Sequence, residues 1–184
     1  MDNGAENYRR FLEGDEKGLE AVITEYKDGL ILFINSYVAN LDTAEELAED
    51  TFVRLFMKKP KNRGGASFKT WLYTIGRNIA VDYLRKIKRR KEEPLEAHYG
   101  LADEENLERE YIRQEQKIAL HKAMNSLKPD YRNLLWLTYF EGMSNKETAE
   151  ITGKKVHAVE MALTRARAAL KEELEKEGFV YEIE

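Results

Sequence analysis

Apolar residues recur at intervals of three and four along most of the chain, the spacing at which side chains share one face of an α-helix. The pattern predicts a first long helix over about Gly18 to Asn40. It predicts a second helix that begins at Asp42 or Thr43, either of which can act as its N-cap. This helix should end before Lys59-Pro60, because the residue before a proline is pushed out of helical geometry. Its expected buried positions are Leu47, Thr51, Phe52, Leu55 and Phe56.

The stretch from Ser67 to Lys91 predicts a helix with two adjacent faces. One face is apolar and can join a core: Phe68, Leu72, Ile75, Ile79 and Tyr83. A neighbouring stripe, about 60° wide at helical spacing, mixes an aromatic ring, an amide and charged groups: Trp71, Asn78, Asp82, Arg85 and Arg89. An indole stacks on an unstacked base, a carboxamide pairs with a base edge, and guanidinium groups neutralise phosphate. The combination indicates nucleic-acid contact, although a solvated amphipathic helix would explain each residue singly.

The segment before this helix, KNRGGASF, contains Arg63 and the paired glycines Gly64 and Gly65. Glycine allows backbone conformations and close approaches that a Cβ atom would prevent. No Gly-Lys-Ser/Thr sequence follows, so the segment is not a phosphate-binding P-loop. We expect either an ordinary turn or a basic pocket beside the aromatic stripe that can hold an extruded base.

The C-terminal part has the spacing of a helix-turn-helix, with small Ala149, turn residue Gly153 and branched Val159. Ser144 and Glu147 are placed to form a capping box at the start of its first helix. The second helix should bury one face: Val156, Val159, Leu163, Ala166 and Leu170. In this motif the N-terminal turns of the second helix enter a DNA major groove. The outward residues available for bases and phosphates are Lys154, Lys155, His157, Ala158, Glu160, Met161, Thr164, Arg165 and Arg167. A generic pair of packed helices is the alternative.

Charge is segregated along the chain, although the formal net charge is only −4. From Arg85 to Lys91 every residue except Ile87 is basic, whereas Glu92 to Gln116 contains nine carboxylates. Because this acidic stretch has too few apolar residues for a core of its own, we interpret it as a linker. The prediction is an all-α fold of two small helical domains: 1–92, an acidic linker over 93–115, and 116–184 with the helix-turn-helix.

Composition narrows the possible functions. The chain has no cysteine, which excludes disulfides, thiolate nucleophiles and cysteine-bound zinc. Its three histidines, His98, His121 and His157, are scattered without metal-binding spacing. No run is long and apolar enough to span a membrane, and the first residues lack the apolar core of a signal peptide. We therefore predict a cytoplasmic protein with no enzymatic activity, cofactor, metal, small-molecule substrate or membrane insertion.

Three segments together resemble the bacterial extracytoplasmic-function (ECF) sigma factors. They are AEELAEDTFVRLF at 44–56, RGGASFKTWLYTIGRNIAVDYLR at 63–85, and LTRARAALKEEL at 163–174, which ends the helix-turn-helix. The resemblance covers most of the chain in the family's order. It implies a subunit that binds core RNA polymerase and recognises promoter DNA. An anti-sigma factor is a common family partner, although none of these residues identifies one.

The resemblance also implies residue roles. The acidic-faced helix would contact the polymerase clamp through Glu45, Glu46, Leu47, Glu49, Asp50, Arg54 and Leu55. The loop and stripe would melt and read the minus-ten element through Arg63, Gly64, Gly65, Phe68, Trp71, Arg77, Asn78, Asp82, Arg85 and Arg89. The helix-turn-helix residues given above would read the minus-thirty-five element.

The sequence departs from the family pattern in two places, and two other functions stay open. Glu160 and Ala162 stand where many members have basic residues, and Gly76 stands where alanine is common. A stand-alone helix-turn-helix regulator would bind duplex DNA as a dimer without polymerase. A helical adaptor that binds no nucleic acid would leave Trp71, Asn78 and the basic run unexplained.

Overall fold

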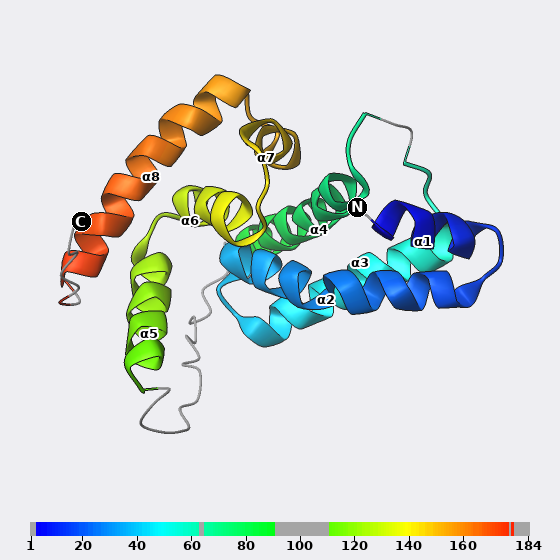
Figure 1. The fold of residues 1–184 in the computed structure, drawn as a ribbon, viewed down its shortest axis with the longest axis horizontal. Coiled ribbons are helices and arrows are strands. Elements are labelled where there is room, and N and C mark those ends of the chain that lie inside the picture. Colours follow the sequence, from blue (N-terminus) through cyan, green and yellow to red (C-terminus); the bar gives the residue numbers. More distant parts are fainter. Residues whose placement is uncertain (1–2, 63–64, 91–110, 177, 179–184) are drawn as a thin grey trace.

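The computed structural model describes residues 3–62, 65–90, 111–176 and 178, and every regular element within these ranges is helical (Figure 1). This confirms the predicted all-α class. The elements are α1 (Asn3–Leu12), α2 (Glu16–Val38), α3 (Leu41–Lys58), α4 (Phe68–Arg90), α5 (Tyr111–Ser126), α6 (Pro129–Leu135), the π-helical turn η1 (Trp136–Phe140), α7 (Asn145–Thr152) and α8 (Val156–Lys176). In Figure 1, α1–α4 form one group and α5–α8 a second, which we call the first and second units.

Helix α1 is an element that the hydrophobic pattern did not predict. Its sequence NGAENYRRFL offers few apolar positions, so no helical period stands out. Two of these, Tyr8 and Phe11, are nevertheless almost fully buried. The Tyr8 ring lies 5.5 Å from that of Phe68 and 5.4 Å from that of Trp71. Tertiary packing against α4 therefore stabilises a helix that its own propensity would leave marginal.

Helix α3 begins earlier than predicted. Asn40, in extended geometry, is the N-cap, and its Oδ1 accepts a hydrogen bond from the backbone N–H of Thr43 at 2.8 Å. The prediction of Asp42 or Thr43 as the cap was wrong, because α2 ends in a left-handed residue, Ala39, that turns the chain directly into the new helix. The predicted end is confirmed, with Lys59 as the C-cap. Phe56 was predicted to be buried but is 48% exposed, with one face of its ring stacked on Phe11.

Helices α2 and α4 cross closely at Gly76. A Cβ atom on this buried glycine would lie 2.8 Å from Leu30 Cδ1, below normal contact distance. Glycine lowers helix propensity by about 1 kcal/mol relative to alanine. At this position glycine leaves room for the Leu30 side chain between the two helices.

The second unit begins with α5, whose first described residue, Tyr111, precedes the predicted domain start at Gln116. The apolar stretch from Asp130 to Glu141 is not one regular α-helix, because after Leu135 the chain widens into the π-helical turn η1. Val156 was predicted to be buried but is 40% exposed, since it opens α8 before that helix reaches the core. The other predicted core positions of α8 are buried or partly buried.

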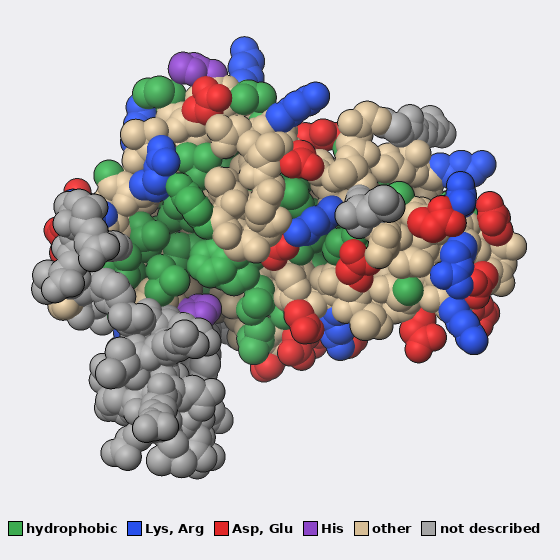
Figure 2. Space-filling model, in the orientation of Figure 1, with side chains coloured by type: hydrophobic (Ala, Val, Ile, Leu, Met, Phe, Trp, Pro, Cys, Tyr) green, Lys and Arg blue, Asp and Glu red, His purple; other side chains and the backbone are tan. Residues whose placement is uncertain are grey.

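The two units pack against each other and share one continuous hydrophobic core. Helix α4 contacts α7, and α2 contacts both α6 and η1. Figure 2 shows further hydrophobic side chains in the hollow between α8 and the α5–α6 pair. Within the described ranges, no helix is both long enough and apolar enough to cross a bilayer.

Candidate nucleic-acid interface

The predicted stripe lies on the outer side of α4. Its charged and amide members, Asn78, Asp82, Arg85 and Arg89, are exposed, whereas Trp71 is half-buried against the first unit. Arg85 Nη1 lies 3.4 Å from Asp82 Oδ1, an exposed pair that contributes little to stability. We call these five residues the α4 row. The structure thus confirms that they share one face and that four of them face solvent.

An open cleft of about 410 Å³ runs along the α4 row. It is lined by Arg54, Pro60, Trp71, Ile75, Arg77, Asn78, Val81, Asp82 and Arg85. Three guanidinium groups, an indole and a carboxamide therefore border one hollow. Such a hollow suits an extruded base whose flanking phosphates need cations.

Arg54 belongs to this cleft by geometry, although the sequence resemblance grouped it with the acidic face of α3. Its side chain is exposed, and within the described residues it has no carboxylate or hydrogen-bond partner. An exposed cation beside Trp71 and Asn78 is better placed for a phosphate than for pairing with its own helix. Sequence spacing missed this because it does not reveal which side of α3 faces α4.

Arg77 lies where the cleft meets the second unit. Its Nη1 donates to Asn78 Oδ1 at 3.1 Å, and its Nη2 donates to the backbone carbonyl of Thr152 at 3.3 Å. Its Nε is buried and has no hydrogen-bond partner among the described residues. The guanidinium is therefore only partly satisfied by protein groups.

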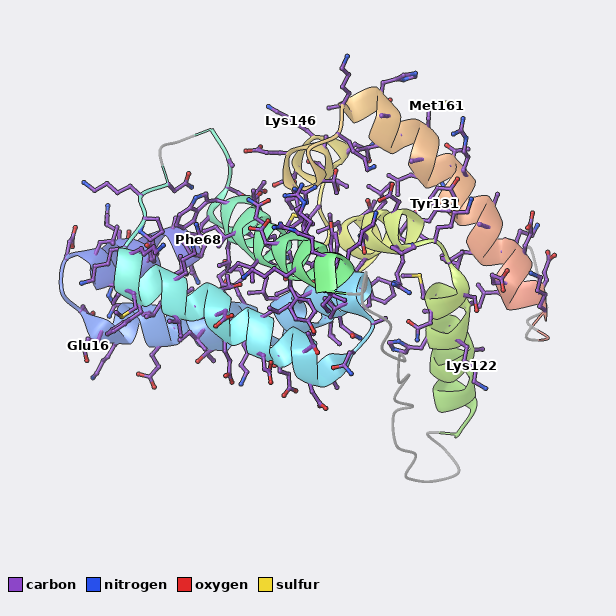
Figure 3. The ribbon with its side chains drawn as sticks, turned by 180° about the vertical axis from the view of Figure 1, so that it is seen from behind. Glu16, Phe68, Lys122, Tyr131, Lys146 and Met161 are labelled. Atoms are coloured by element: carbon purple, nitrogen blue, oxygen red, sulfur yellow. The ribbon has the colours of Figure 1, made fainter. Side chains whose placement is uncertain are left out.

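One predicted contact residue is excluded by burial. Phe68 is 2% exposed, with its ring packed against those of Tyr8, Tyr26 and Trp71. Figure 3 places it at the beginning of α4, among the other helices of the first unit. The expectation that Phe68 contacts DNA was wrong, because its ring is buried and packs against that of Trp71. Of the loop residues, Gly65 has a left-handed φ of 103°, and Arg63 and Gly64 lie outside the described residues.

The outer face of α3 carries the predicted polymerase contacts. Glu45, Glu46, Glu49 and Asp50 are all exposed, as predicted. Leu47 and Leu55 are 7% and 0% exposed, so their predicted contact role was wrong, because both face the core. Sequence reasoning missed two apolar residues beside the carboxylates, Val53 and Met57, which are 56% and 72% exposed. Their position outside the buried stripe of α3 was the available signal.

The helix-turn-helix forms as predicted. The Ser144 backbone N–H donates to Glu147 Oε2 at 2.9 Å, and the Glu147 N–H donates to Ser144 Oγ at 3.3 Å, completing the capping box. The pKa of Glu147 is lowered chiefly by the Ser144 backbone N–H and by the Ser144 hydroxyl, which donates to Oε2 at 2.7 Å, and the hydroxyls of Thr70 and Ser67 lower it further. Gly153 ends α7 with a φ of 69°, a left-handed conformation that suits glycine.

The start of α8 presents mostly unpaired side chains to solvent. Lys155, His157, Ala158 and Met161 are exposed, and Figure 3 shows Met161 on the outer surface of the helix. Lys154 is engaged with Asp130 at 3.0 Å, while His157 lies 3.7 Å from Glu160. Further along, Thr164, Arg165 and Arg167 are also exposed. All the predicted minus-thirty-five residues thus lie at or near the surface of one helix and the turn before it.

The described residues contain no cluster of three or more histidine or acidic side chains able to hold a metal ion. The surfaces offer rings, amides and cations, which bind nucleic acid through stacking, base-edge hydrogen bonds and phosphate neutralisation. The fold thus combines a helix-turn-helix, a cleft that carries cationic and aromatic groups along α4, and an exposed acidic face on α3.

Comparison with known proteins identifies the class. The model of the sigma-70 region 2 family matches residues 22–90, and the model of the sigma-70 region 4 family matches residues 117–170. The first match runs from within α2 to the end of α4 and includes the α4 row, and the second runs from within α5 into α8 and includes α7 and the turn at Gly153. Both matches fall on the surfaces described above.

Relatives align over nearly the whole chain. The chain is 27% identical over 175 residues to the RNA polymerase sigma-H factor of Pseudomonas aeruginosa, covering 90% of this chain and 91% of that protein. It is 28% identical to the sigma factor YlaC of Bacillus subtilis, over 86% and 92% of the two chains. It is 26% identical to the ECF sigma-E factor of Escherichia coli, over 88% of each.

A solved structure gives the same result for the fold. The sigma factor RpoE of Bartonella quintana, crystallised with the anti-sigma factor NepR, superposes with a TM-score of 0.68 at 26% identity, over 86% of this chain and 98% of that one. The chain belongs to the ECF sigma factors. It binds core RNA polymerase and directs promoter recognition, and the stand-alone regulator is not favoured.

Proposed function

We propose that the two units divide promoter recognition between them, the first reading the minus-ten element and the second the minus-thirty-five element. The observation that supports this most strongly is the cleft along α4. It combines an aromatic ring, an exposed carboxamide and three arginines within one hollow. The domain limits we propose remain 1–92 and 116–184, with the acidic residues 93–115 between them and residues 93–110 outside the described ranges.

In this proposal, Trp71 and Asn78 hold an extruded base of the melted element. Arg54, Arg77 and Arg85 neutralise the flanking phosphates, and Arg63, Gly64, Gly65, Asp82 and Arg89 complete the set from the sequence. Melting costs a few kcal/mol per unstacked base, so the cleft needs polymerase to hold it at the promoter. We expect weak duplex binding by the isolated chain because phosphate contacts fall steeply with salt.

The acidic face of α3 is the proposed polymerase contact. Its carboxylates would meet cationic groups, while contact with polymerase would remove the exposed apolar area of Val53 and Met57 from water. We also propose that the protein acts in the cytoplasm, where its polymerase is. An anti-sigma partner is a further proposal, supported by the likeness to the Bartonella quintana factor that was crystallised with one.

Size-exclusion chromatography with purified core polymerase tests the contact on α3. The double charge reversal E46K/D50K should abolish co-elution at equal stoichiometry. E20K/E25K is the matched control, since both residues are exposed on α2 and the change in net charge is the same. Equal loss in both variants would show that only overall charge matters.

Permanganate footprinting of the melted region tests the cleft. Asn78→Ala should reduce opening without affecting polymerase binding, because Asn78 is exposed and, within the described part of the chain, its side chain bonds only to neighbouring Arg77. Arg54→Ala should behave in the same way if Arg54 serves DNA. If Arg54→Ala instead weakens co-elution with polymerase, the residue belongs to the α3 contact.

A further inference from the structure

The lining of the α4 cleft includes Pro60, and the backbone just before this proline has an uncommon geometry. Lys59 has a φ of 39°, which places a residue other than glycine in the left-handed region. Such a conformation costs energy and persists where surrounding contacts hold it. The position of Pro60 in the cleft therefore depends on the contacts that anchor this turn.

Helix α1 supplies two anchors for the turn. Tyr8 Oη donates a hydrogen bond to the backbone carbonyl of Pro60 at 2.8 Å. The Nζ atom of Lys59 lies 4.8 Å from the centroid of the Phe11 ring, within the range of a cation–π interaction. Tyr8 and Phe11 are 3% and 2% exposed, so both anchors are fixed in the core of the first unit.

The same tyrosine contacts the aromatic member of the cleft. The Tyr8 ring centroid lies 5.4 Å from that of Trp71. Tyr8 thus touches two lining residues, Pro60 through its hydroxyl and Trp71 through its ring. Burial raises the pKa of Tyr8 to about 12, so the hydroxyl stays protonated and able to donate near neutral pH. Because Tyr8 is almost fully buried, it can act on DNA through these two residues and not by direct contact.

Close packing holds α1 in this place. Figure 1 shows α1 next to the beginning of α4, and the two helices are in contact. A Cβ atom at Gly4 of α1 would lie 2.5 Å from Phe68 Cδ1 and 2.5 Å from Tyr26 Oη, so glycine permits the close approach. The sigma-70 region 2 match begins at residue 22, so α1 lies outside the part of the chain that this family model covers.

We propose that Tyr8 is a positioning residue for the minus-ten site. It holds Pro60 and Trp71 in the arrangement in which the α4 cleft accepts an extruded base. The inference rests on the proposed role of the cleft and adds α1 to the elements that build it. Without the hydroxyl, the turn at Lys59 loses its hydrogen-bonded anchor, and Pro60 can move relative to Trp71. The base would then lose contact area, while the arginines would keep their phosphate contacts.

Binding of a forked promoter DNA by reconstituted polymerase tests this role. The fork is single-stranded across the minus-ten element, and an abasic scan with the unchanged protein identifies the nucleotide whose base contributes most to binding. Tyr8→Phe removes the hydroxyl and keeps the ring. Its matched control is Tyr26→Phe, which removes the hydroxyl of another buried tyrosine that packs against Phe68.

Tyr8→Phe should weaken binding of the fork roughly five-fold when the base is present, the size of one lost hydrogen bond. It should cause no further weakening when that nucleotide is abasic, because the cleft then has no base to hold. Tyr26→Phe should leave both affinities unchanged. Equal weakening on the two DNAs, or the same result in Tyr26→Phe, would show a general effect on the fold and overturn the inference. No weakening in Tyr8→Phe would overturn it as well.

Lys59→Met tests the second anchor without changing the core, because the Lys59 side chain is exposed. It should weaken binding of the base-containing fork about two-fold, the size of an exposed cation–π interaction. Lys58→Met is the matched control, since Lys58 is the exposed neighbour and the change in net charge is the same. Equal loss in both variants, or a loss that persists on the abasic fork, would overturn the assignment of Lys59 as an anchor.

Fluorine NMR separates this inference from the proposed function. The chain has two tryptophans, Trp71 and Trp136, so labelling with 5-fluorotryptophan gives two resonances that Trp136→Phe assigns. Tyr8→Phe should shift the Trp71 resonance more than Tyr26→Phe does and leave that of Trp136 in place. An unmoved Trp71 resonance would overturn the positioning role. An abasic scan without effect in the unchanged protein would instead refute the proposed base-holding cleft, whatever the resonances show.

Discussion

The two DNA-facing surfaces of this sigma factor differ in how much of the fold depends on them. On α4, Trp71 packs against Tyr8 and Phe68, and Arg77 bonds to the second unit, so residues proposed to bind DNA also stabilise the protein. At the start of α8, Lys155, His157 and Met161 are exposed and only the buried face holds the helix in place. Binding and stability should therefore be coupled in the first unit and separable in the second.

Trp71→Ala should give the largest effect and couple the two properties. Loss of a half-buried indole with two ring neighbours should lower the free energy of unfolding by about 2–3 kcal/mol and also abolish promoter opening. Chemical denaturation and permanganate footprinting measure the two effects. Normal stability with lost opening would show that Trp71 contributes nothing to packing. Binding and stability would then be separable in the first unit as well as in the second.

Asn78→Ala should affect opening alone. The side chain is exposed, so stability should change by no more than about 0.5 kcal/mol. Loss of a base-edge contact worth about 1–3 kcal/mol should reduce opening roughly ten-fold. Footprints identical to those of the unchanged protein would remove Asn78 from the site.

Ser144→Ala should lower the free energy of unfolding by about 1 kcal/mol, because it removes an N-cap.

A pH series tests the other half of the capping box, the Glu147 carboxylate. The pKa of Glu147 is lowered in the folded protein, so its contribution is present above its unfolded value of 4.5 and is lost as pH falls through the folded pKa. In urea denaturation, the unchanged protein should have a higher free energy of unfolding than Glu147→Gln at neutral pH. This difference should shrink as the pH falls below about 4.5. An advantage that is constant with pH would mean that the carboxylate is not the group responsible.

Lys155→Ala should have the smallest effect and leave stability unchanged. We expect roughly five-fold weaker binding of the upstream element by the polymerase complex, with the salt slope reduced by about one. Opening on a pre-melted template should stay normal. A loss of stability in Lys155→Ala would show that DNA binding and stability are coupled in α8, as we expect them to be in α4.

Several features could be read from the sequence because they depend on neighbours along the chain. The capping box at Ser144 and Glu147, the left-handed turn at Gly153 and the end of α3 before Pro60 are all local. Helical spacing also identified the α4 row. The same spacing misjudged Phe56 and Val156, because a period gives the side of a helix but not whether another helix covers it.

Other features required the tertiary structure. Helical spacing placed Phe68 on the core face, and only the family resemblance grouped it with the DNA-binding residues. Spacing gave no reason to pair Arg54 with Trp71 across two helices. Glu141 is an unremarkable acidic residue in the sequence, and only packing surrounds it with Tyr73, Lys69 and Trp136.

The sequence alone determined the helical class, the helix-turn-helix and the family, since these follow from periods and short motifs that the backbone reads locally. The tertiary structure decided which helix faces were covered, where the cleft lay and that the second unit rests on the first. Those outcomes depend on contacts between residues as far apart as Ser36 and Asn133. Burial and hydrogen bonding at that separation are properties of the packed chain, and no local pattern encodes them.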